Sequence, residues 1–191
     1  MNLLTKIFLF GCFFIANQSL FSEDKIKECK ILKNLGCGYK KHIENSVWIV
    51  PTSTLLAYEH LNNSQIPVSD QTVWIINEFN QGYFFGDSYT SLNGTPSSHR
   101  EIVGSITPDG NVYIAFYPTS GDVENTDIVN GIGTFKKERG KYFFLMQMNS
   151  AENSLTGLSH WSYMIRVQPE DFFYQHLPGV NISVPEFISQ F

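Results

Sequence analysis

Polar and aromatic side chains gather at the facing ends of two segments that have the pattern of neighbouring strands. They are Gln147, Asn149, His160, Trp161 and Tyr163. An antiparallel connection through residues 150–158 would bring those two ends together. Amide, imidazole and aromatic groups at the mouth of a barrel suit a small ligand with an apolar body and a few hydrogen-bonding atoms. We therefore predict a ligand-binding site there, with ordinary packing and backbone capping as the alternative role of the same side chains.

His160 is the member of this group that could perform acid–base chemistry, because imidazole titrates near neutral pH. A general base needs a partner, and the sequence places no carboxylate beside His160. Asp87 and Glu78, from another hairpin, are the candidates for that partner. This alternative would make the chain an isomerase, a cyclase or a hydrolase, but the sequence assigns no catalytic residue.

Signatures of the common enzyme classes are missing from the sequence. Residues 157–161 begin like a nucleophile elbow but lack its closing glycine, and the pair Glu59-His60 stands without a second histidine. There is no glycine-rich phosphate loop and no dinucleotide fingerprint. We therefore predict no cofactor and no metal.

The segments that would position these residues form a regular series. From Val47 onward, short runs rich in β-branched and aromatic residues alternate with turn residues, as strands do. Hairpin turns are predicted at Asn80–Gly82, Thr107–Gly110 and Arg139–Gly140. Consecutive hairpins form an antiparallel meander, and about eight strands close most economically into a barrel. The predicted fold class is all-β, an antiparallel up-and-down barrel with short helical or irregular terminal segments. The strand-like runs are Val47–Val50, Thr72–Phe79, Tyr83–Tyr89, Ile102–Thr107, Asn111–Tyr117, Gly131–Lys137, Tyr142–Asn149 and His160–Val167.

Both faces of several predicted strands are partly apolar, as the alternation along Tyr142–Asn149 illustrates. One face would line the barrel interior, and the other must be covered by terminal segments or by a partner. Pro51–His60 has the pattern of a short helix capped by Ser53, or of an irregular wrap. Short helices are also expected after Pro169 and at Pro185, with apolar residues of the C-terminus docked on the barrel. Those docking residues are Phe187, Ile188 and Phe191.

The N-terminus has the pattern of an export signal. Lys6 precedes an apolar stretch of ten residues, Ile7–Ala16, which is too short for a membrane span of about 20 residues. We predict a signal peptide over residues 1–22 and a secreted or periplasmic protein without a transmembrane segment. Two alternatives remain open: a lipobox at Leu9–Cys12, with acylation of Cys12, and a buried N-terminal helix.

Export would leave two cysteines, Cys29 and Cys37, which suggests a disulfide in an oxidising compartment. Their spacing is not that of a metal site.

The predicted organisation is a cysteine-pinned segment over residues 23–45 and a barrel domain over residues 46–191. A formal net charge of -5 argues against a nucleic-acid partner.

An exported chain of about eight hairpin-linked strands with an aromatic interior resembles the calycin barrels, of the lipocalin and avidin type. The resemblance is architectural and covers Val47–Val167; the lipocalin signature of Gly-x-Trp is absent around Trp48. It implies a binding protein for a small apolar or amphipathic ligand. The alternatives are a protein-interaction module at the cell envelope or host interface, and an enzyme acting on a lipid-like substrate. The oligomeric state is not predicted.

Overall fold

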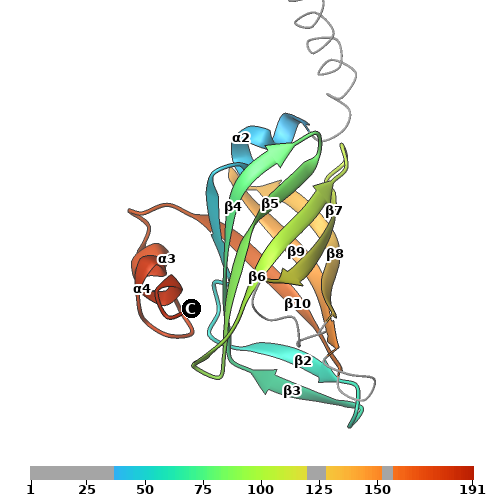
Figure 1. Cartoon of the computed structure of the whole chain (residues 1–191), viewed down its shortest axis with the longest axis vertical. Coiled ribbons are helices and arrows are strands. Elements are labelled where there is room, and N and C mark those ends of the chain that lie inside the picture. The colour runs from blue at the N-terminus through green and yellow to red at the C-terminus, as the bar shows by residue number, and fades with distance from the viewer. Residues whose placement is uncertain (1–36, 120–127, 152–156) are drawn as a thin grey trace, which may run out of the picture.

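Eight antiparallel strands form a closed barrel in the computed structural model, which describes residues 37–119, 128–151 and 157–191 (Figure 1). β1 closes the barrel by pairing with β4 on one side and with β10 on the other. The predicted all-β barrel is therefore confirmed. Its strands are β1 (Ser46–Ile49), β4 (Asp70–Asn80), β5 (Tyr83–Leu92), β6 (Thr95–Ile106), β7 (Asn111–Pro118), β8 (Ile128–Glu138), β9 (Lys141–Ala151) and β10 (Gly157–Val167).

Tight turns join most of the consecutive strands. Gln81-Gly82, Asn93-Gly94 and Arg139-Gly140 each have both residues at positive φ, the geometry of a type I′ hairpin turn. At the predicted turn over Thr107–Gly110, the Gly110 amide donates a 2.9 Å hydrogen bond to the Thr107 carbonyl. The three predicted hairpins are confirmed. The Asn93-Gly94 hairpin was not predicted, although an Asn-Gly pair is a strong hairpin signal.

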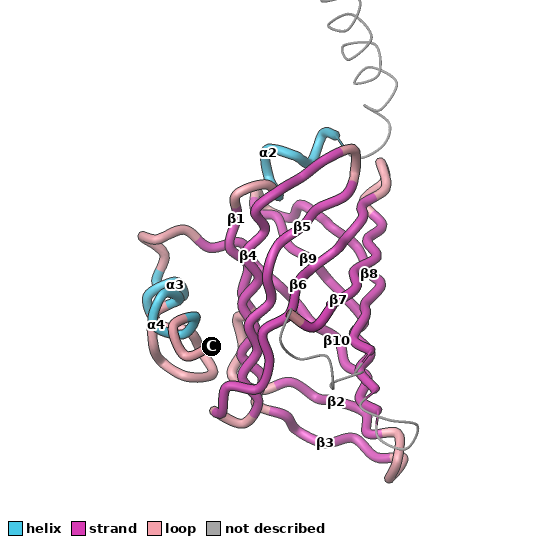
Figure 2. The backbone as a smooth tube through the Cα atoms, in the orientation of Figure 1, coloured by secondary structure: helices cyan, strands magenta, loops and turns pink. Residues whose placement is uncertain are grey.

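A further hairpin lies across one end of the barrel (Figure 2). It consists of β2 (Leu55–Glu59) and β3 (Ser64–Val68), and β2 pairs with the first residues of β10. The short helix predicted over Pro51–His60 is wrong. The segment is extended instead because β3 and the edge of β10 both supply partner strands, and pairing of this kind overrides weak local propensity.

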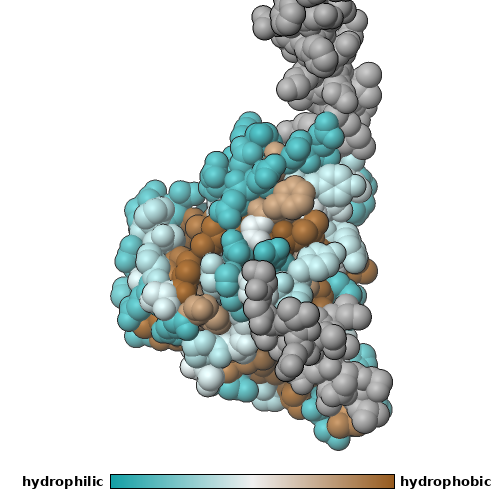
Figure 3. Space-filling model, viewed as in Figure 1, coloured by the Kyte–Doolittle hydropathy of each residue, from teal (hydrophilic) through white to brown (hydrophobic). Residues whose placement is uncertain are grey.

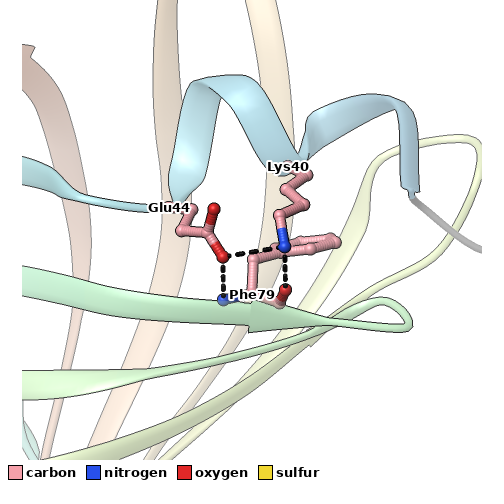
Figure 4. A network of polar contacts seen from close by, with 3 residues as sticks. All are labelled: Lys40, Glu44 and Phe79. Atoms are coloured by element: carbon pink, nitrogen blue, oxygen red, sulfur yellow. Dashed lines mark hydrogen bonds and ion pairs between the residues drawn. The ribbon is translucent and has the colours of Figure 1, made fainter.

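The opposite end of the barrel is covered by η2 (Cys37–Tyr39) and α2 (Lys40–Ile43). Ile43 is fully buried against the interior. Lys40 Nζ lies 3.0 Å from Glu44 Oε1 and donates to the Phe79 carbonyl at 3.3 Å, while the Phe79 amide donates to the same Glu44 oxygen (Figure 4). These contacts attach the helical cap to the end of β4.

Aromatic rings fill the half of the barrel next to this cap. Phe144 is at the centre, with ring centroids 4.7 Å from Trp48, 4.8 Å from Phe135 and 5.7 Å from Trp74. Gly104 makes room for another ring, because a Cβ there would lie 2.0 Å from the Phe84 side chain. This half of the barrel is a packed core.

The C-terminal segment covers part of the outer face of the barrel. It contains α3 (Phe172–Gln175) and α4 (Val184–Ile188), and it buries Phe187 against β1 and β4 residues such as Ile49 and Val73. The Ser183 side chain caps α4 by accepting a hydrogen bond from the Glu186 amide. The predicted helical docking segment is confirmed, although Phe191 remains 39% exposed.

Several sequence predictions fall outside the described residues. These are the signal peptide over residues 1–22, the lipobox cysteine Cys12 and the Cys29 partner of the expected disulfide. Within the described part of the chain, no helix combines the length and apolar character that a membrane span requires.

Candidate functional site

A cavity of about 270 Å³ occupies the half of the barrel that faces the β2–β3 hairpin. Its floor is formed by Trp74, Phe116 and Met148, at the edge of the aromatic core. The exposed residues Leu92 and Ser97 mark its mouth. Its remaining lining includes many polar side chains, namely Asp70, Thr72, Ser88, Thr90, Ser98, Arg100, Asn149, Ser150, His160 and Ser162.

Strand alternation explains why these polar groups point inward. On β4, Asp70 and Thr72 lie on the same face as Trp74, which belongs to the core. On β10, His160 and Ser162 share the face of the fully buried Met164. The inner faces of β4 and β10 therefore change from apolar to polar along their length.

Asp70 is the acidic residue of this lining, and it is only 4% exposed. The Thr72 hydroxyl donates a 2.7 Å hydrogen bond to its Oδ1 atom and contacts the Thr90 hydroxyl at 3.1 Å. Burial raises the pKa of Asp70 to about 6, because a carboxylate loses hydration inside the barrel, and the bond from Thr72 opposes this shift. Its side chain forms no ion pair within the described residues.

Buried hydroxyls and an imidazole complete the polar surface. Ser88 and Ser162 are each 4% exposed, and neither side chain has a hydrogen bond to another described residue. Burial lowers the pKa of His160, so that the imidazole is neutral at pH 7. Arg100 is 8% exposed on β6 and lines the same cavity.

The structure separates the five residues that were predicted to form a site. Asn149 and His160 line the cavity, whereas Gln147, Trp161 and Tyr163 do not. Trp161 is 62% exposed and Tyr163 43% exposed on the outer face. They alternate along β10 with the inward-facing His160 and Ser162, so one strand cannot direct all of them to the same cavity. A binding role for the outer three stays a prediction.

His160 has no carboxylate partner within the described residues. Asp87, a candidate for that role, lies instead on the outer face, where it bonds His99 at 3.0 Å and accepts from Asn77. Glu78 is also exposed. The geometry therefore does not favour His160 as a general base.

A separate polar contact lies where β2 meets β10. His60 Nε2 is 2.8 Å from Ser159 Oγ, and this hydroxyl is also 2.8 Å from Asn149 Oδ1. The contact is exposed, and it connects the β2 end to the rim of the cavity through Asn149.

The residues that sequence reasoning missed are Asp70, Ser88, Arg100 and Ser162. Their signal was polarity at positions that share a face with apolar core residues, as in Asp70-x-Thr72-x-Trp74. Groups of three or more His, Cys, Asp or Glu able to hold a metal are absent from the described residues.

Comparison with known proteins found no matching family model, no matching curated protein and no matching solved structure. The resemblance to calycin barrels therefore stays a prediction, and the site is interpreted from its own geometry.

Proposed function

We propose that this chain is a binding protein that holds a small amphipathic molecule in the cavity of its barrel. The observation that carries the proposal is the hollow itself, whose lining includes the Ser88 and Ser162 hydroxyls, which have no hydrogen-bond partner among the described residues. Protein interiors are normally close-packed, and buried polar groups are normally hydrogen-bonded. A bound ligand would fill the hollow and would supply hydrogen-bond partners to the hydroxyls that line it.

The size and lining of the cavity indicate the kind of ligand. The volume of the cavity is about 270 Å³. This is close to the lower end of the usual range for ligand pockets, about 300–1,000 Å³. Because the floor is aromatic and the walls combine polar side chains with apolar ones such as Val68 and Val129, the ligand would have an apolar body and a hydrogen-bonding head.

Export of the protein remains part of this proposal. The apolar stretch Ile7–Ala16 after Lys6 supports a signal peptide and a secreted or periplasmic location. Sequencing the N-terminus of the protein from its natural producer tests this part, because cleavage near Ser19 or Ser22 is expected.

The binding function is tested by calorimetric titration with 1-octanol, n-octylamine and octanoate. These probes share an eight-carbon tail and differ in the head group. At least one is expected to bind with one-to-one stoichiometry. Ser88→Phe, which fills the cavity from β5, should abolish the heat, and Ser105→Phe on the outer face of β6 should not. The proposal is wrong if no probe binds, or if Ser88→Phe folds and binds like the unmodified chain.

A second candidate function, a protein-interaction module, is favoured by a row of exposed side chains on the outer face. Tyr113, Ile132, Gln147 and Trp161 are direct cross-strand neighbours on β7–β10. Apolar side chains also reach the surface on the face that β4–β7 and the C-terminal segment turn toward the viewer in Figure 3. Exposed apolar patches of this kind commonly mark interaction surfaces.

Photo-crosslinking tests the interaction module. A photoreactive phenylalanine analogue replaces Trp161, and the same analogue at the exposed turn residue Asp109 is the control. One protein adduct of defined mass that forms at position 161 and not at position 109 supports this function. Equal labelling at both positions contradicts it.

A further inference from the structure

We propose that the cavity selects a ligand with a protonated amine, and that the Asp70 carboxylate is its counter-ion. The inference rests on the proposed function, because it requires that a small molecule occupies the cavity. It adds to that function the charge of the ligand and the residue that recognises this charge.

The first argument is the unbalanced charge of Asp70. Its side chain is 4% exposed, and its one hydrogen bond from a described residue comes from Thr72 to Oδ1. A carboxylate has about four lone-pair sites, so Oδ2 keeps its capacity to accept hydrogen bonds. A buried charge without an opposite charge is costly, and a cation brought by the ligand would relieve that cost.

The second argument is the order of groups along β4. Asp70, Thr72 and Trp74 follow one another on the inner face, and four residues of strand span about 13 Å. Trp74 and Phe116 lie 5.8 Å apart between ring centroids at the floor. An amine bound at Asp70 would therefore direct its apolar body along the strand toward an aromatic surface.

The other charged group of the lining does not reverse this choice. Arg100 would favour an anion, but its side chain already interacts with a partner within the protein. His160 is held neutral by burial, so it offers no charge at pH 7. Asp70 is thus the charge most in need of a partner from the ligand.

The order of affinities among the three eight-carbon probes at pH 8 tests the inference on the unmodified chain. We expect n-octylamine to bind at least tenfold more tightly than 1-octanol, and octanoate to bind most weakly. Equal affinity for the amine and the alcohol would overturn the inference. Tightest binding of octanoate would do so as well and would identify Arg100 as the selecting charge. If none of the probes binds, the proposed function fails and the inference fails with it.

Asp70→Asn identifies the residue responsible. The variant keeps the shape of the side chain and an acceptor for Thr72 but removes the charge. Its affinity for n-octylamine should fall at least fivefold more than its affinity for 1-octanol. Asp87→Asn makes the same chemical change on the outer face and should leave the amine preference intact. A preference that survives Asp70→Asn would contradict the assignment.

Discussion

The two halves of this barrel are built by the same strands and have opposite interiors. Near α2, the inner face of β4 contributes Trp74 and Ile76 to a core of interlocking rings. Toward the β2–β3 hairpin, the same face contributes the polar side chains of Asp70 and Thr72 to the lining of a hollow. The difference indicates that the two halves of the barrel have different roles along the strand axis. The closed half supplies stability through apolar burial, and the open half is less tightly packed and contains the polar groups of the proposed site.

The largest expected effect comes from breaking the closed half. Phe144→Ala removes the ring that contacts Trp48, Trp74 and Phe135, and it should lower the free energy of unfolding by about 3–5 kcal/mol. Ser162→Ala on the neighbouring strand removes a hydroxyl without a described partner and should change it by less than about 1 kcal/mol. Urea denaturation of both variants measures the difference. Equal losses would show that the open half is as tightly packed as the closed half.

Asp70→Asn is expected to have the next largest effect on the free energy of unfolding, and it should stabilise the folded chain at neutral pH instead of destabilising it. The pKa of Asp70 is raised to about 6 in the folded chain, above the ordinary value of 3.8, so the folded state holds the proton more tightly. Stability from this group is therefore present below about pH 4 and is lost as the pH rises through about 6. Asp70→Asn should raise the free energy of unfolding at pH 7.5 by about 1–3 kcal/mol.

The same variant should show little gain at pH 4, where the native carboxyl is already protonated. Urea denaturation at the two pH values measures this contrast. A loss of stability at pH 7.5 in Asp70→Asn would mean that the ionised carboxylate is stabilised by contacts within the protein, and it would weaken the proposal of a cationic ligand.

Much of the barrel could be predicted because the residue patterns that indicate its strands and turns are local in the sequence. Turn pairs such as Arg139-Gly140 require positive φ at both residues, and apolar alternation on the strands between them sets which face is buried. The β2–β3 hairpin could not be predicted in this way. Leu55–Glu59 pairs along its whole length with Ser64–Val68, and its second partner is the start of β10 near His160, about 100 positions away, which no local pattern reports.

The candidate site was predicted only in part, for a related reason. Asn149 and His160 line the cavity, but Trp161 and Tyr163 were grouped with them on residue type and lie on the outer face. A period of two assigns these neighbours to opposite faces. Asp70 was missed because a polar residue at a strand end resembles a capping residue until the position of the cavity along the barrel axis is known.

A smaller effect is expected at the cap of the closed half. Glu44→Ala removes an ion pair to Lys40 and the acceptor of the Phe79 amide, and it should lower the free energy of unfolding by about 1 kcal/mol. Lys40→Ala should lower it by less than about 0.5 kcal/mol, because this side chain is 56% exposed and its ion pair is screened. Thermal denaturation of both variants at low and high salt measures which of them loses more stability. A larger effect of Lys40→Ala would show that its bond to the Phe79 carbonyl holds the cap.

The smallest change in stability is expected on the outer face, where the contrast between buried and exposed rings can be observed directly. The chain has three tryptophans; Trp48 and Trp74 are at most 2% exposed in the barrel interior, and Trp161 is 62% exposed. Trp161→Phe should change the free energy of unfolding by less than about 0.5 kcal/mol, as is usual for exposed positions. It should also remove the component of the fluorescence that acrylamide quenches readily. If the quenchable emission persists in Trp161→Phe, solvent reaches Trp74 through the cavity, and the open half extends deeper into the barrel than its aromatic floor.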